Sequence, residues 1–101
     1  MKYSLTDKLN FDDNPVIDIK GKLINVNSDA ETVLKLMDLI ESKGEMETSK
    51  EAPNLLFSEK DLKTIKDLKL QFNDYMTVIS TAIALAIGED PDADTKNQGE
   101  A

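Results

Sequence analysis

The longest apolar stretch of the chain, residues 68–87, constrains its fold more than any other feature. The sequence there is LKLQFNDYMTVISTAIALAI. It contains neither Gly nor Pro, and Gly88 follows it. Its apolar residues recur at steps of three and four, which is typical of an α-helix. They occupy two adjacent faces, so most of the circumference is apolar or small. We expect a helix of this kind to be covered on two sides.

The two faces of this helix supply the candidate interaction residues. The first face consists of Phe72, Met76, Ile79 and Ile83, and the second of Tyr75, Val78, Ala82 and Leu85. The first face is expected to pack on an earlier stripe formed by Val33, Leu34, Met37 and Ile40, which Leu36 widens. The second is harder to bury with so few other elements, so it either completes the core or mediates self-association or partner binding. All eight residues are therefore candidates for such contacts, as is the edge of an N-terminal hairpin.

Composition argues against several classes of function. The 101 residues suffice for one domain with a modest core. Twenty acidic residues against twelve lysines, with no arginine, give a net charge of -8, which argues against binding to nucleic-acid phosphates. Cys and His are absent, so disulfides, thiol catalysis and the commonest general base are excluded. With no glycine-rich phosphate loop either, we predict a non-catalytic protein without cofactor or metal.

The apolar stretch is interrupted where a membrane span would be continuous. Lys69, Gln71, Asn73 and Asp74 lie in its first half, whereas a span needs about 20 predominantly apolar residues. The N-terminal sequence MKYSLTDKLNF lacks the apolar segment of a signal peptide. We therefore expect a soluble, cytoplasmic protein with no membrane partner.

The N-terminal part predicts a β-hairpin preceded by an irregular arm over residues 1–15. Residues 16–20, VIDIK, and 23–27, LINVN, are rich in β-branched side chains and are expected to be strands. Gly21 and Lys22 would form a two-residue type II′ turn between them. Because an isolated hairpin is marginally stable, it should lie on a helix or pair with another chain.

A first helix is expected from Asp29 to about Ser42. Ser28 would cap it, with Glu31 completing a capping box, and Gly44 would end it. Residues 45–54, EMETSKEAPN, have no apolar stripe and predict a polar loop.

A second helix is expected to begin at Ser58, because Ser58 and Asp61 have the capping-box spacing. Its buried stripe would be formed by Leu62, Ile65 and Leu68. We expect a break near Leu70 rather than a continuous helix, because Asn73-Asp74 suits the start of a helix. The third, apolar helix would then end at Gly88.

Residues 89–101, EDPDADTKNQGEA, carry no periodic apolar residues and predict a disordered acidic tail. The spacing of Asp90, Asp92 and Asp94 resembles the first ligands of an EF-hand loop, but Thr95 stands where that loop requires glycine and Ala101 where it requires Glu. A solubilising tail is therefore the favoured interpretation. The predicted fold class is mainly α (α+β): one helical domain over residues 1–88, with three helices and a small N-terminal β-hairpin, followed by the tail.

The order of these segments resembles a known family. A short β-type segment, an acidic helix and a polar loop precede Phe57-Ser58-Glu59-Lys60-Asp61, which opens a helix; Phe72-Asn73-Asp74-Tyr75-Met76 then opens a long Ala/Ile-rich helix before an acidic tail. This layout, over residues 16–88, is similar to that of the tail assembly chaperones of long-tailed phages and Gram-positive prophages. Its most recognisable piece is the aromatic–x–Asp–aromatic start of the last helix.

The resemblance implies a non-catalytic function. Proteins of that family are largely helical, self-associate, and coat the tape measure protein while tail tube subunits polymerise around it. A programmed frameshift in many phages appends a domain that recruits the tail tube protein, and residues 89–101 would fall where such an extension joins. The implied partners are a second copy, the tape measure protein and the tail tube protein, and the chaperone is not expected in the mature virion.

Two other interpretations remain open. An acidic inhibitor or DNA mimic, such as an antitoxin or anti-restriction protein, would use its carboxylates against a basic partner, and its binding would vanish at high salt. A structural head–tail connector subunit would instead be found in purified virions.

Overall fold

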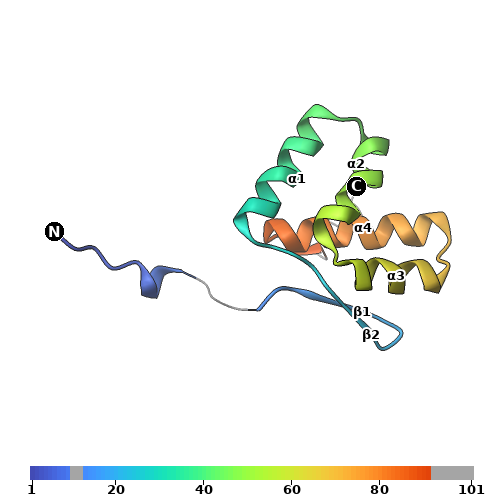
Figure 1. Cartoon of the computed structure of the whole chain (residues 1–101), viewed down its shortest axis with the longest axis horizontal. Coiled ribbons are helices and arrows are strands. Elements are labelled where there is room, and N and C mark those ends of the chain that lie inside the picture. Colours follow the sequence, from blue (N-terminus) through green and yellow to red (C-terminus); the bar gives the residue numbers. More distant parts are fainter. Residues whose placement is uncertain (10–12, 92–101) are drawn as a thin grey trace, which may run out of the picture.

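Four helices and a two-stranded hairpin make up the computed structural model, which describes residues 1–9 and 13–91 (Figure 1). The mainly α fold with an N-terminal β-hairpin is confirmed. The predicted tail lies outside the described residues from residue 92 onward, as do Asp92 and Asp94. The elements are a short 3-10 turn, Thr6–Lys8, then β1 Val16–Ile19, β2 Lys22–Asn25, α1 Ala30–Ser42, α2 Glu45–Leu56, α3 Glu59–Leu68 and α4 Phe72–Ile87.

Helix α2 occupies the segment predicted as a polar loop, so the prediction of three helices was one too few. Its buried residues include Thr48, Ala52 and Leu56, at steps of four. Only Leu56 has a large apolar side chain, so the sequence shows no clear apolar periodicity in this segment. The prediction that Gly44 supplies the C-cap of α1 was also wrong, because Lys43 is the C-cap. Gly44 has φ -72° and ψ 169° and stands at the N-terminus of α2.

The helix starts follow local hydrogen bonding. Ser58 caps α3, since its hydroxyl accepts a bond of 3.2 Å from the Asp61 N–H, as predicted. Asp29, rather than Ser28, caps α1: its carboxylate accepts from the Thr32 N–H at 3.2 Å and from the Thr32 hydroxyl at 2.7 Å. Ser28 instead donates its hydroxyl to Asn14 at 3.1 Å, so its side chain is not available as a cap.

The cap of α1 predicts a pH dependence of stability. The hydrogen bonds from Thr32 hold the pKa of the Asp29 carboxyl below its ordinary value of 3.8. Because the folded-state pKa is the lower one, this contribution is present above the unfolded pKa and is lost as the pH falls through the folded value. Asp29→Asn keeps an N-cap but has no carboxyl group to protonate. As the pH falls below about 4, we therefore expect the free energy of unfolding to decrease less in this variant than in wild type. Urea unfolding across a pH series measures this, and equal losses in the two proteins would contradict it.

The hairpin turn differs from the predicted one. Lys20 and Gly21 are its central residues, with φ 53° and 83°, and Ile19 pairs with Lys22 across the turn. Positive φ at both positions defines a type I′ turn, whose twist matches that of the flanking strands. The Asp18 carboxylate accepts a 2.8 Å bond from the Gly21 N–H. The type II′ turn at Gly21-Lys22 was therefore wrong by one residue.

The hairpin lies on the helices, as expected for so small a sheet. The Asn25 N–H donates to the buried Asp61 carboxylate of α3 at 3.2 Å. Asn27 donates its backbone N–H to Leu56 at 2.8 Å and its side-chain amide to Leu55 at 3.1 Å. These bonds fix the hairpin against the end of α2 and the start of α3, and they place Ile24 and Val26 in the core.

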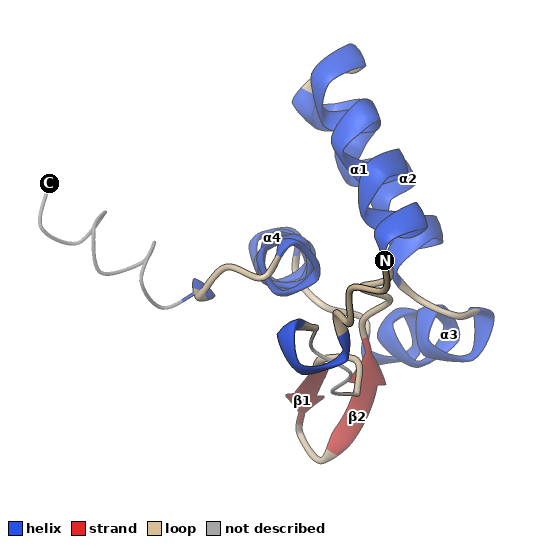
Figure 2. Cartoon of the chain, turned by 90° about the vertical axis from the view of Figure 1, so that its left-hand side faces the viewer, coloured by secondary structure: helices blue, strands red, loops and turns tan. Residues whose placement is uncertain are grey.

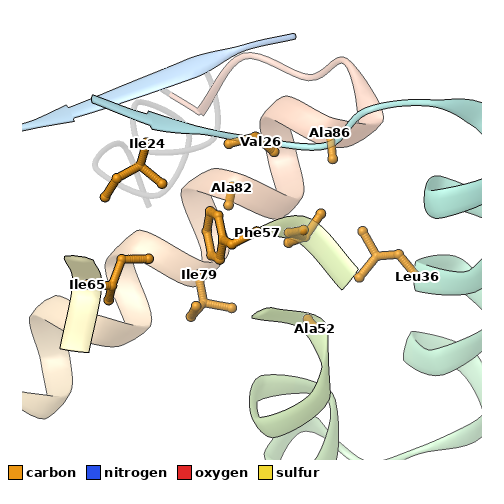
Figure 3. Packing of buried hydrophobic residues seen from close by; sticks show 10 residues of the cluster. Ile24, Val26, Leu36, Ala52, Phe57, Ile65, Ile79, Ala82 and Ala86 are labelled. Atoms are coloured by element: carbon orange, nitrogen blue, oxygen red, sulfur yellow. The ribbon is translucent and has the colours of Figure 1, made fainter. Parts of the chain in front are cut away.

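The core forms where the hairpin and the four helices converge. Phe57, in the short connection between α2 and α3, lies in the middle of the cluster, close to Ile79 and Ala82 of α4 (Figure 3). Leu36 joins it from α1, Ala52 from α2 and Ile65 from α3. Phe57 lies outside any helix, yet its side chain is surrounded by residues of several elements. We therefore expect the core to depend strongly on Phe57.

Helix α4 begins and ends as predicted. Lys69, with φ 50°, ends helix α3, and Asp74 lies in the first turn of α4. Asn73, however, does not cap this helix, because the capping position is Gln71. Gly88 ends α4 with φ 94°, and the Glu89 N–H bonds the Ala84 carbonyl at 2.8 Å, which is a Schellman motif.

The packing of α1 and α4 differs from the expected arrangement. Helix α4 packs mainly on α2, while α1 also packs on α2, and the α1–α2 pair rises away from α4, seen end-on in Figure 2. The α1 side chain that is fully buried is Leu36, whereas Leu34, Met37 and Ile40 of the predicted stripe are exposed. The predicted stripe was therefore wrong at Leu34, Met37 and Ile40, whereas Val33 packs against the core and Leu36, expected to widen the stripe, is buried in it.

Within residues 1–9 and 13–91, no helix combines the length and the apolar character that crossing a bilayer would require.

Candidate interaction surfaces

A strip of apolar side chains runs along the outside of α1. Leu34 is 67% exposed, Met37 46% and Ile40 42%, and these three residues define the outer strip. They follow one another at steps of three, so they form a continuous row that turns gradually around the helix. The buried Leu36 lies nearly opposite Leu34. Helix α1 is therefore apolar on two faces, and the described residues cover only one of them.

A groove of about 370 Å³ lies where α1, α2 and α4 meet. Ile79 is 2% exposed and forms its floor. Half-buried Met76 and Ile83 line it from α4, and Ile40 lines it from α1. Its remaining lining residues, which come from α2 and α4, are Glu45, Thr48, Ser49 and Ser80. We call this the central groove; it meets the outer strip at Ile40.

A second hollow, of about 380 Å³, lies between α3 and α4. Leu62, Ile65, Leu70 and Tyr75 supply its apolar lining, and Lys66 and Lys69 complete it. We call it the lysine-rimmed pocket. Neither lysine ammonium group has an ion pair within residues 1–9 and 13–91. Both cations are therefore free to meet a negatively charged surface.

The eight candidate residues of α4 are divided between these surfaces and the core. Ile79 and Ala82 are buried in the core, and Phe72 is 63% exposed. The other five are half-buried: Met76 and Ile83 in the central groove, Tyr75 in the lysine-rimmed pocket, and Val78 and Leu85 elsewhere on the helix. The first face, expected to be covered by α1, thus remains partly open. A role of these residues in association stays a prediction.

The outer strip was not recognised from the sequence as an interaction surface. The signal was present, because Val33, Leu34, Leu36, Met37, Leu39 and Ile40 are six apolar residues within eight positions. A helix that covers a core on one side needs a narrower stripe. The excess of apolar residues on α1 indicated a second apolar face.

The outer strip is flanked by carboxylates. Asp38 and Glu41 follow Leu34 by four and seven residues and so lie on its face of the helix. Within the described part of the chain neither forms an ion pair, whereas Glu31 on the same helix bonds Lys35 at 3.4 Å. Residues 28–57 carry seven acids and three lysines, a net charge of -4. The outer strip therefore has carboxylate neighbours in Asp38 and Glu41, although Asp38 also lines a hollow that contains Lys35 and Lys43.

Comparisons with protein-family models, with curated proteins and with solved structures find no match to this chain. The functional interpretation accordingly rests on the surfaces described above and on the order of the sequence segments.

Proposed function

We propose that the protein is a non-catalytic assembly chaperone of the phage-tail type, which self-associates and binds the tape measure protein. The observation that carries this proposal is the central groove, because it leaves apolar side chains of the longest helix open to a partner. The order of sequence segments that resembles the tail assembly chaperones gives the class of partner. Under this proposal the protein acts in the host-cell cytoplasm and leaves before the virion matures.

The central groove suits the apolar face of a partner helix. Ile40 lines it from α1 and Met76 and Ile83 from α4, so an inserted helix would contact both. Recognition of this kind uses apolar anchors spaced one helical turn apart. A tape measure protein, as a long helical chain, would offer such anchors repeatedly. The chaperone would act by covering them, and no bond is made or broken.

The negative charge of the chain is consistent with this task. A protein that exposes apolar surface risks aggregating with itself, and a net charge far from zero opposes such aggregation. The chain has a net charge of -8. Exposed apolar side chains and net repulsion together favour binding to a specific client over indiscriminate association.

Co-expression with the tape measure protein of the same gene cluster tests the proposal. We expect the wild-type chaperone to keep the tape measure protein soluble and to co-purify with it. Ile40→Glu places a charge at the edge of the central groove and should reduce the co-purified tape measure protein at least about tenfold, as expected when a buried anchor is lost. Because Ile40 is 42% exposed, the variant should remain folded, which circular dichroism verifies.

Leu23→Glu is the matched control. Leu23 is 67% exposed on β2 and does not line the central groove, so its replacement adds the same charge elsewhere. We expect this variant to bind as wild type does. Equal losses in both variants, or no complex with wild-type protein, would refute the groove as the client site. Recovery of the protein in purified virions would contradict the chaperone and favour a structural connector.

A further inference from the structure

The two apolar surfaces outside the central groove have opposite charge. The outer strip exposes Leu34 and Met37, with the carboxylates of Asp38 and Glu41 beside them on the following turns of α1. The lysine-rimmed pocket is an apolar hollow with Lys66 and Lys69 in its lining. One surface projects apolar side chains and the other can receive them. The charged groups beside the two surfaces are thus of opposite sign, and one surface offers apolar side chains where the other has an apolar hollow.

Both surfaces belong to one chain, yet they cannot meet within it. In both perpendicular views α1 lies above the level of α4 and α3 lies below it, so the two surfaces belong to different parts of the fold (Figures 1 and 2). The contact that satisfies both surfaces is therefore between two molecules.

We propose that the outer strip of one copy docks into the lysine-rimmed pocket of the next. Leu34 and Met37 enter the hollow lined by Leu62, Ile65, Leu70 and Tyr75, while Asp38 and Glu41 meet Lys66 and Lys69. This inference rests on the self-association contained in the proposed function, and it specifies the surfaces and their relative orientation.

A contact between two different surfaces is head-to-tail, so it leaves the pocket of one copy and the outer strip of the other copy free. Such an interface builds closed rings or open filaments, and it gives a two-fold dimer only where both contacts form between the same two copies. Charge disfavours the symmetric alternatives. Pairing two outer strips would bring Asp38 and Glu41 of both copies together, and pairing two pockets would do the same to the lysines. The charge pattern therefore selects the head-to-tail arrangement.

Two charge-reversal variants of the full chain test the orientation of the contact. The acidic-side variant is Asp38→Lys with Glu41→Lys, and the basic-side variant is Lys66→Glu with Lys69→Glu. Each variant alone should associate at least about tenfold more weakly than wild type, because two attractive exposed pairs become repulsive. An equimolar mixture should recover the wild-type association, since every interface in an alternating assembly again joins opposite charges. Light scattering over a concentration series measures the molar mass.

Lys60→Glu with Lys63→Glu provides the matched control. Both lysines lie on the same helix α3 and are exposed, but neither lines the pocket. This variant changes the net charge as the basic-side variant does, so it should associate nearly as wild type does. Circular dichroism of all three variants verifies that the helices are retained.

The outcomes separate this inference from the proposed function. If wild type associates but the mixture does not recover what each variant loses, the head-to-tail contact is refuted while self-association stands. If both reversed variants associate as wild type does, the interface lies elsewhere and the inference is likewise overturned. A wild-type chain that is monomeric at every concentration would refute self-association itself, and the inference with it.

Discussion

Phe57→Ala is expected to reduce the free energy of unfolding by about 3–5 kcal/mol. The Phe57 ring is 3% exposed and lies in the middle of the core, between elements that are distant in sequence. Its removal leaves a cavity that no single helix can close, because the hairpin, α3 and α4 are each held in place by other contacts. Domains of this size have a stability of about 5–15 kcal/mol. We therefore expect the variant to be close to unfolding at room temperature.

Urea unfolding followed by far-UV circular dichroism measures this effect. Phe72→Ala is the matched control, since it removes the same side chain from a position that is 63% exposed. The control should change stability by less than about 0.5 kcal/mol. If the two variants were equally stable, Phe57 would not be the centre of the core.

The sequence was most informative where structure is set by neighbouring residues. Ser58 accepts a bond from a residue three positions on, and Gly88 needs only its own freedom to take positive φ. The stripe of Leu62 and Ile65 follows from spacing alone, and the break between α3 and α4 was predicted from Asn73-Asp74 as a helix start, although Gln71 is the capping residue. Such features depend on a few consecutive residues, so they can be recognised without knowing the rest of the fold.

Helix α2 could not be recognised in this way. Its stripe of Thr48, Ala52 and Leu56 resembles that of an exposed segment, and Pro53 argues against a helix at that point. The helix is stabilised by contacts with both α1 and α4. This is tertiary structure overriding a weak local preference, and such an effect is not visible in a short window of sequence.

The covered face of α1 was also beyond sequence reasoning. With apolar residues on two faces, the helix has two equally plausible orientations, and the choice depends on where α2 lies. Since α2 was not predicted, the stripe was assigned to the face that contains Leu34 and Met37. The error in α1 follows from the missing helix. For the same reason, the uncovered surface was sought on α4 and not on α1.

The corrected orientation of α1 leads to a paired prediction on neighbouring residues. Leu36 is fully buried, whereas Leu34 is 67% exposed two positions earlier in the same helix. Leu36→Ala should cost about 2–5 kcal/mol of stability through lost burial and a residual cavity. Leu34→Ala should change stability by less than about 0.5 kcal/mol, because it removes exposed atoms and introduces a good helix former.

The two variants should rank in the opposite order when self-association, rather than stability, is measured. Leu34→Ala should weaken self-association, because Leu34 is the most exposed side chain of the outer strip, while Leu36→Ala should not do so where it is folded. Stability must be measured in dilute solution, since association of the native state adds to apparent stability as concentration rises. Urea unfolding gives the stability of each variant, and light scattering over a concentration series gives its self-association. If Leu34→Ala were the more destabilised of the two in dilute solution, α1 would present its other face to the core, and the outer strip would not exist as a surface.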